Sequence, residues 1–179
     1  LELGAYTDTI TITSNDLESS IIEVPVSMSV YSSDTWYVDE NAAPDGDGSE
    51  GSPFNLMQVA IDSSEHEDIV LVYPGTYYEN INFNGKNIVV QSAEGANTTT
   101  IDGNASGPVV TFTNGENSST ILRGFTITNG SADTGGGILC ENSNPALEDL
   151  IITGNIANDK GGGIYFEQSS TNLSHLTIN

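Results

Sequence analysis

Cationic side chains, cysteine and long apolar runs are all scarce in this chain of 179 residues. Lys and Arg number 3 against 25 Asp and Glu, which gives a formal net charge of −22. Such a surface repels phosphate backbones and anionic lipids, so the composition argues against binding to nucleic acid or to a membrane surface. It also argues against polyanionic substrates unless cations bridge them. The charge suits a high-salt environment, Ca²⁺ binding or, most simply, a solvated acidic face.

The single cysteine, Cys140, excludes a disulfide within the chain. It follows Ile138 and Leu139 in an apolar run, which predicts a buried, inert thiol rather than a nucleophile. No stretch approaches the ~20 apolar residues of a membrane span, so we expect no membrane insertion. The first residues lack the basic start and apolar core of a secretory signal, which fits a mature or trimmed product.

A repeat near the C-terminal end is the most informative pattern that is present. Residues 129–138 return as 155–164, an offset of 26 residues, with Asn, Asp, a Gly-Gly-Gly run and Ile at matching positions. The same offset joins Ile138 to Ile164, Leu147 to Leu173 and Leu150 to Leu176. A fixed period of about 20–50 residues marks stacked supersecondary units. Each unit here consists of short β runs between Asn, Asp and Gly, which predicts a β-solenoid.

Residues 1–33 form a separate unit in the sequence. Strict alternation of apolar and polar residues over 9–13 and 22–30 predicts a β-hairpin with one apolar side, joined by a turn at 14–20. The pattern that runs from Gly4 through this hairpin resembles the last two strands of bacterial immunoglobulin-like domains. Because an isolated two-stranded hairpin is marginal in water, its apolar face requires upstream strands, the solenoid or another molecule as a partner.

Residues 34–179 begin with loop chemistry and one helix. Ser52 suits the N-cap and Pro53 the first helical position, while apolar residues recur at i, i+3, i+6 and i+7 from Phe54. We therefore expect one amphipathic helix over about 53–64. Short strands follow it, each bounded by Gly, Asn or Ser clusters.

The order of these motifs carries a resemblance. They are Trp36-Tyr-Val-Asp, an acidic glycine loop, Pro53-Phe54 with its helix, and Val72-Tyr-Pro-Gly-Thr-Tyr. This order resembles the opening of right-handed parallel β-helix domains of the pectate-lyase-like and pectin-esterase-like superfamily, in which the helix caps the solenoid. The repeat is similar to those of polymorphic outer-membrane proteins and related adhesins. The expected fold is all-β: a right-handed parallel β-helix with an N-terminal capping α-helix, preceded by a hairpin from an immunoglobulin-like sandwich.

The enzymes of this superfamily have requirements that the chain meets poorly. Its lyases use a basic residue beside bridging Ca²⁺, and only Lys86, Arg123 and Lys160 are basic. None of the three lies in a recognisable lyase motif. Glycosidases need two carboxylates that face one groove, for which Asp102 and Asp149 are the candidates. Chance pairings are expected among 25 acids, so we predict no catalytic residues.

One acidic loop carries a metal hypothesis. Oxygen ligands at alternate positions between flexible glycines suit Ca²⁺, which takes 6–8 oxygens. The candidate ligands are Asp39, Asn41, Asp45, Asp47, Ser49 and Glu50. The loop lacks the distal Glu and flanking helices of an EF-hand, and a solvated acidic turn is the alternative. His66 and His175 lie far apart in sequence, and we expect both at the surface.

Two classes of function stay open from the sequence. The first is a non-catalytic extracellular structural or adhesion protein, secreted or at the cell surface, which self-associates or binds other surface proteins. Its sharper form is a filament subunit joined through N-terminal strands and open β-helix ends. The second is a polysaccharide-binding or polysaccharide-degrading module, which rests on fold analogy alone. Both ends of the chain look unfinished, which fits a filament subunit and a fragment of a longer chain equally well.

Overall fold

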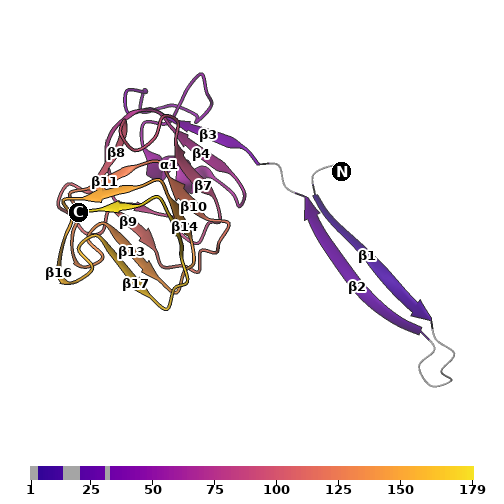
Figure 1. The fold of residues 1–179 in the computed structure, drawn as a ribbon. Coiled ribbons are helices and arrows are strands. Elements are labelled where there is room, and N and C mark those ends of the chain that lie inside the picture. Colours follow the sequence, from indigo (N-terminus) through magenta and orange to yellow (C-terminus); the bar gives the residue numbers. More distant parts are fainter. Residues whose placement is uncertain (1–3, 14–20, 31–32) are drawn as a thin grey trace. The chain divides into compact units, whose positions relative to one another are not determined.

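The computed structural model describes residues 4–13, 21–30 and 33–179. The chain divides into two units, residues 1–32 and 33–179 (Figure 1). The first unit contains the antiparallel strands β1 (Gly4–Thr13) and β2 (Ile21–Val30), which confirms the expected pairing of two strands. The expected turn at 14–20 lies outside the described residues.

The hairpin has one apolar face among its described side chains. Ile10 lies opposite Val24, and Asp8 lies opposite Val26 on the same side of the ladder. Ile10, Val24 and Val26 are 53%, 40% and 38% exposed. The other apolar positions expected on this face, Ile12, Ile22, Met28 and Val30, have side chains outside the described set. The described part of the apolar face is therefore uncovered within its own unit.

The second unit is a parallel β-solenoid of about four turns, as the sequence predicts. Its first sheet holds β3 (Thr35–Val38), β4 (Ile69–Val72), β7 (Val89–Ser92), β10 (Ile121–Arg123), β14 (Ala146–Glu148) and β18 (Asn172–Ser174). Its second sheet holds β5 (Gly75–Tyr78), β8 (Thr99–Asp102), β11 (Thr126–Thr128), β15 (Ile151–Thr153) and β19 (Thr177–Ile178).

A third sheet completes each turn, and a small corner sheet is present only in the last two complete turns. The third sheet holds β6 (Ile81–Asn82), β9 (Val110–Phe112), β13 (Ile138–Glu141) and β17 (Ile164–Glu167). The corner sheet pairs β12 (Ser131–Thr134) with β16 (Ile156–Lys160). The chain passes from the first sheet to the second and then to the third, and begins again one turn further along.

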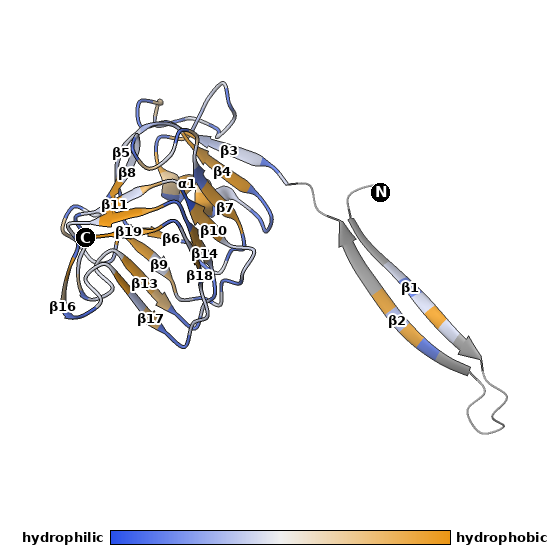
Figure 2. Cartoon of the chain, in the orientation of Figure 1, coloured by the Kyte–Doolittle hydropathy of each residue, from blue (hydrophilic) through white to orange (hydrophobic). Residues whose placement is uncertain are grey.

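Apolar residues recur on successive strands of the solenoid (Figure 2), and their buried side chains form columns along the axis. In the first sheet the column consists of Val70, Val90, Leu122 and Leu147, and in the second of Ile101, Ile127 and Ile152, all fully buried. The Phe83 and Phe112 rings lie 4.5 Å apart, which adds aromatic packing between turns. Full burial of one such aliphatic side chain stabilises the fold by roughly 1.5–3 kcal/mol.

The structure confirms the repeat and also corrects one part of it. Ile138 pairs with Ile164 and Leu147 with Leu173, as the offset of 26 predicts. At the corner sheet, however, Ser131 pairs with Ile156, and the register shifts farther along the strand. The strand β16 has five residues where β12 has four. A bulge of one residue therefore separates two registers within one turn.

The expected equivalence of Asn129 and Asn155 is wrong because of this bulge. Asn129 and Gly154 both have a left-handed backbone, with φ of 60° and 66°, and are the equivalent corner residues. Asn155 instead takes the place of Gly130. Its Oδ1 accepts a hydrogen bond from the Gly130 N–H at 2.8 Å, and its Nδ2 donates to the Ile127 carbonyl at 2.9 Å. The asparagine thus joins two turns.

The single described helix, α1 (Met57–Ser63), begins later than the sequence predicts. The expected N-cap at Ser52 and first helical position at Pro53 are wrong, because the residues before Met57 are not helical. The carboxylate of Glu79 supplies the cap instead. It accepts hydrogen bonds from the first two helical N–H groups at 2.8 and 3.0 Å. The side chain of the residue that follows β5 thus satisfies donors that the sequence pattern assigns to a local cap.

The other end of α1 is held by Lys86. Its Nζ donates to the carbonyls of Ile61, Asp62 and Ser64 at 2.8, 2.6 and 2.7 Å. A cation at this position also interacts favourably with the C-terminal end of the helix. Between the two ends, the Gln58 amide exchanges hydrogen bonds with the backbone of Asn82 in β6 at 2.8 and 3.1 Å. The helix therefore covers the first strand of the third sheet.

We predict that Lys86→Met destabilises the solenoid by roughly 1.5–3 kcal/mol, because it removes charge-assisted hydrogen bonds to three carbonyls. Urea unfolding followed by circular dichroism measures the change. Lys160→Met is the matched control, since Lys160 is exposed and carries the same charge; we expect it to stay within about 0.5 kcal/mol. Equal effects of both substitutions would show that charge alone, and not the helix contact, matters.

Candidate functional site

The acidic loop that the sequence singles out lies between β3 and α1. Gly48 anchors it: the residue has φ of 82°, and a side chain there would collide with the rings of Trp36 and Phe54. These two rings stack at 5.8 Å. The Gly48 N–H donates to the Ser52 carbonyl, and the Gly48 carbonyl accepts from Tyr37. The loop backbone is therefore fixed against the first sheet.

Two carboxylates of this loop accept hydrogen bonds from backbone N–H groups of the loop itself. Asp39 Oδ1 accepts from the Asn41 N–H at 2.9 Å, and Asp47 Oδ1 accepts from the Ser49 N–H at 3.0 Å. Hydrogen bonds from Ser49 lower the pKa of Asp47. Asp45, Asp47, Ser49 and Glu50 are exposed. In the described part of the chain, no three His, Cys, Asp or Glu side chains are grouped so that they could hold a metal ion.

All three cations of the chain are engaged within the solenoid. Lys86 binds the helix carbonyls. The Arg123 Nε donates to Gln91 Oε1 at 2.8 Å, a second guanidinium nitrogen contacts the same oxygen, and Nη1 lies 4.0 Å from Glu148 Oε2. Lys160 Nζ lies 5.9 Å from the centre of the Tyr165 ring, within reach of a cation–π interaction. All three basic side chains that were candidates for a lyase base therefore have partners within the solenoid.

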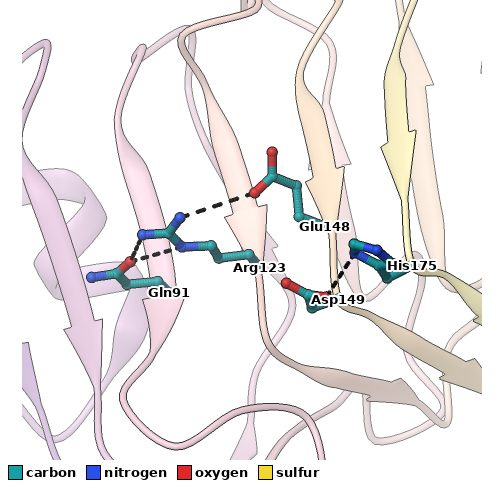
Figure 3. A network of polar contacts seen from close by, with 5 residues as sticks. All are labelled: Gln91, Arg123, Glu148, Asp149 and His175. Carbon is teal, nitrogen blue, oxygen red and sulfur yellow. Dashed lines mark hydrogen bonds and ion pairs between the residues drawn. The ribbon is translucent and has the colours of Figure 1, made fainter.

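Arg123 belongs to a polar column on the outer face of the first sheet (Figure 3). Gln91, Arg123 and Glu148 occupy the same register position in β7, β10 and β14. Beside this column, His175 Nδ1 lies 3.1 Å from Asp149 Oδ1. The side chains are substantially exposed, so such ion pairs add little stability. Sequence reasoning examined Arg123, Asp149 and His175 separately and missed that stacking of turns places them side by side.

The two candidate glycosidase carboxylates do not come together. Asp102 is in register with Thr128 and Thr153, at the end of the second-sheet strands, whereas Asp149 lies between β14 and β15, before the second-sheet strand of its turn. Asp102 Oδ1 accepts from the Asn104 N–H at 2.8 Å and from the Asn129 amide at 2.9 Å. Asp149 faces His175. The two carboxylates thus lie at opposite ends of the second-sheet strands and in different turns, so they do not form a pair.

The remaining side chains considered from the sequence are structural or exposed. His66 is exposed, as expected, and its Nδ1 accepts from the Asn87 N–H at 3.0 Å. Cys140 is buried, also as expected. Burial raises the pKa of the Cys140 thiol, which disfavours the reactive thiolate. Neither residue belongs to a constellation with catalytic or metal-binding geometry.

A buried carboxylate that the sequence does not reveal lies at another corner. Glu116 has no exposed surface and accepts hydrogen bonds from the Gly85 N–H at 2.8 Å, the Asn114 N–H at 3.0 Å and the Ser143 hydroxyl at 2.7 Å. These donors come from successive turns. Three donors compensate the loss of solvation, so the group joins turns rather than reacting with a substrate.

A shallow cleft of about 290 Å³ adjoins the start of α1. Its lining residues are Glu40, Asn55, Leu56, Thr76, Tyr77, Tyr78 and Glu79. Tyr78 is 70% exposed. Burial raises the pKa of Glu79 from its ordinary 4.5, and the hydrogen bonds from Gln58 and Met57 oppose this effect. Both Glu79 oxygens already accept helix N–H groups, which gives this carboxylate a structural role in the cleft.

Comparisons with known proteins give no family assignment. No model of a known protein family matches the chain, and no curated protein matches it. Among residues 4–13, 21–30 and 33–179, no helix has the length and apolar character needed to cross a bilayer.

The raised pKa of Glu79 predicts a pH dependence of stability. The folded protein holds this proton more tightly than the unfolded chain, so the group contributes stability that is complete below about pH 4.5 and is lost as pH rises through the folded-state pKa. We expect the stability of the native protein relative to Glu79→Gln to fall as the pH rises above about 4.5. Urea unfolding across that range measures it.

The exposed Glu94→Gln is the control for this experiment, and its stability relative to the native protein should not follow the same curve. A native protein that gains stability over Glu79→Gln with rising pH would contradict the assignment.

Proposed function

We propose that this chain is a non-catalytic structural or adhesive module of an extracellular protein, secreted or held at the cell surface. The observation that carries the proposal is the use of its cations: Lys86, Arg123 and Lys160 all have partners within the solenoid. A lyase of the superfamily that the motifs resemble needs a base that is free to meet its substrate. The separation of Asp102 from Asp149 also counts against a glycosidase pair.

The architecture supports the same proposal at a finer level. The parallel ladders and helix over the first turn agree with a right-handed parallel β-helix of the pectate-lyase-like superfamily, with coils similar to those of polymorphic outer-membrane proteins. The antiparallel hairpin agrees with the final strands of an immunoglobulin-like sandwich. Proteins with such modules serve in surface display or in adhesion. We therefore propose that this chain associates with itself and with other surface proteins.

We predict no turnover on a panel of uronate and neutral polysaccharides, with or without millimolar Ca²⁺, because the three basic side chains all have partners within the solenoid and the candidate carboxylates Asp102 and Asp149 lie apart. Assays for reducing ends and for unsaturated products measure this. Product formation that disappears in Arg123→Gln would favour the alternative, a polysaccharide-degrading module. Glycan arrays test polysaccharide binding without cleavage.

We also propose a weak Ca²⁺ site in the acidic loop. Its carboxylates are not grouped around one point in the structure, and Asp39 and Asp47 each use one oxygen to accept a hydrogen bond from their own turn. A cation would therefore have to draw the loop together, so we predict a dissociation constant of about 10⁻⁴–10⁻³ M, as in extracellular calcium modules. Titration calorimetry measures it, and Asp45→Asn with Asp47→Asn should remove the heat. Asp133→Asn, an exposed carboxylate in β12, is the control. A heat that survives the loop substitutions would place the binding elsewhere.

A further inference from the structure

The chain contains three Asn-Gly dipeptides, which are Asn84-Gly85, Asn114-Gly115 and Asn129-Gly130. Asparagine before glycine is chemically labile. The glycine nitrogen loses its proton and attacks the side-chain carbonyl carbon of the asparagine, the amide nitrogen leaves as ammonia, and water opens the succinimide ring to aspartate or isoaspartate. Glycine favours this attack because it has no side chain to obstruct the ring. The three dipeptides differ in how the fold holds the two reacting groups.

Both reacting groups of the first dipeptide are held by carboxylates. The Gly85 N–H donates to Glu116 Oε1 at 2.8 Å, and the Asn84 side-chain amide donates to Asp62 Oδ1 at 3.1 Å. Hydrogen bonds to a carboxylate are among the stronger ones in proteins. The nitrogen that would attack is therefore engaged, and the amide that it would attack is bound to another group.

The third dipeptide is held in the same way by different side chains. The Gly130 N–H donates to Asn155 Oδ1 at 2.8 Å, and the Asn129 amide donates to Asp102 Oδ1 at 2.9 Å. Gly130 is also buried, so the water that must open a succinimide ring has little access. Asn155, which the bulge places opposite Gly130, thus protects the preceding turn.

The middle dipeptide lacks this protection. The Gly115 N–H donates to the Ser143 hydroxyl at 3.2 Å, the long end of the range for such a hydrogen bond, and this acceptor is neutral. Among the described residues, no hydrogen bond holds the Asn114 side-chain amide. Asn114 and Gly115 are both exposed, and a Cβ built at Gly115 would meet no atom within 4 Å. Both reacting groups are therefore open to each other and to water.

We propose that Asn114-Gly115 is a site of spontaneous deamidation, at which the folded protein takes up water, releases ammonia and gains a carboxylate. The product lies beside the buried Glu116, whose Oε2 accepts the Asn114 N–H at 3.0 Å. A new carboxylate there disfavours the charged form of Glu116. Isoaspartate also carries the main chain through the side chain and displaces this N–H. Because Glu116 joins successive turns, the modification weakens their contact. The inference is independent of the proposed function.

Peptide mapping of the full chain tests the site. After incubation at mildly alkaline pH, trypsin cleaves behind Lys86, Arg123 and Lys160, so each Asn-Gly dipeptide falls in a different peptide. Mass spectrometry of fragment ions then measures deamidation at each asparagine. In the native protein we expect Asn114 to react about tenfold faster than Asn84 or Asn129, the factor that one lost hydrogen bond implies. In urea the three rates should be roughly equal, because the dipeptides are identical.

Two substitutions test the protecting contact. Asn155→Ala frees the Gly130 N–H and should raise the rate at Asn129 by about tenfold, with the rate at Asn84 unchanged. Asn158→Ala, which removes an exposed asparagine of the same strand, is the matched control and should leave all rates as they are. A variant that fails to fold is recognised because all three sites then react at the rates seen in urea, and the comparison of native and unfolded wild-type chain remains decisive.

The consequence for the fold is measured on the reaction product. Anion exchange separates the deamidated chain, which carries one more negative charge, and its urea midpoint should be lower than that of the unreacted chain. Asn114→Gln should prevent formation of this fraction. Native rates that are equal at the three dipeptides, or lowest at Asn114, would overturn the site. A deamidated fraction with an unchanged urea midpoint would overturn the effect on Glu116.

Discussion

The parallel backbone ladder between successive turns is the interaction on which the whole solenoid depends. One turn has too few residues to bury its own inward side chains, so each turn becomes stable only when it is covered by its neighbours. The first-sheet column shows this directly: Leu147 is fully buried beneath the next strand, whereas Leu173, its partner one turn further, is 51% exposed. The same residue type at the same position changes its burial because β14 has a neighbouring strand on each side, whereas β18 is the edge strand of its sheet.

The ladder also dictates what stands at the corners. A chain that turns between sheets needs residues with a left-handed backbone, and equivalent corners of three successive turns hold Gly124, Asp149 and His175, with φ of 79°, 51° and 52°. Glycine is the natural choice there, and short polar side chains are tolerated. The Asp149–His175 contact, which has the residue types of a catalytic dyad, is thus explained by stacked corners.

The sequence predicts those features of the fold that repeat. The period, the inward Ile and Leu positions and the short strands follow from alternation and from the spacing of glycines. The bulge in β16 is hidden because one extra residue among polar ones leaves no periodic trace, and it made Asn129 and Asn155 appear equivalent. The start of α1 is hidden for another reason: its cap comes from Glu79, and no local pattern reveals a donor–acceptor match over that distance.

The sequence predicted which types of residue the candidate site contains, but it did not predict how their side chains are arranged. Glu116 stands in a segment, Asn114-Gly-Glu-Asn, that looks like a solvated turn. Its burial depends on donors from Gly85 and Ser143, which reach it only because turns stack. The acidic loop was recognisable from composition, yet the roles of Asp39 and Asp47 in their own turns follow from backbone geometry alone. Stacking thus decides which polar residues become structural.

The charge distribution limits how copies of such a chain could join. The three cations have partners within the solenoid, and the chain carries a large net negative charge. Ion pairs between copies would therefore be scarce, and repulsion opposes contact at low ionic strength. In the proposed self-association, two kinds of interaction would oppose this repulsion: backbone hydrogen bonds at strand edges, and divalent cations shared by carboxylates. Screening by monovalent salt strengthens the first and weakens the second, so ionic strength distinguishes them without any substitution.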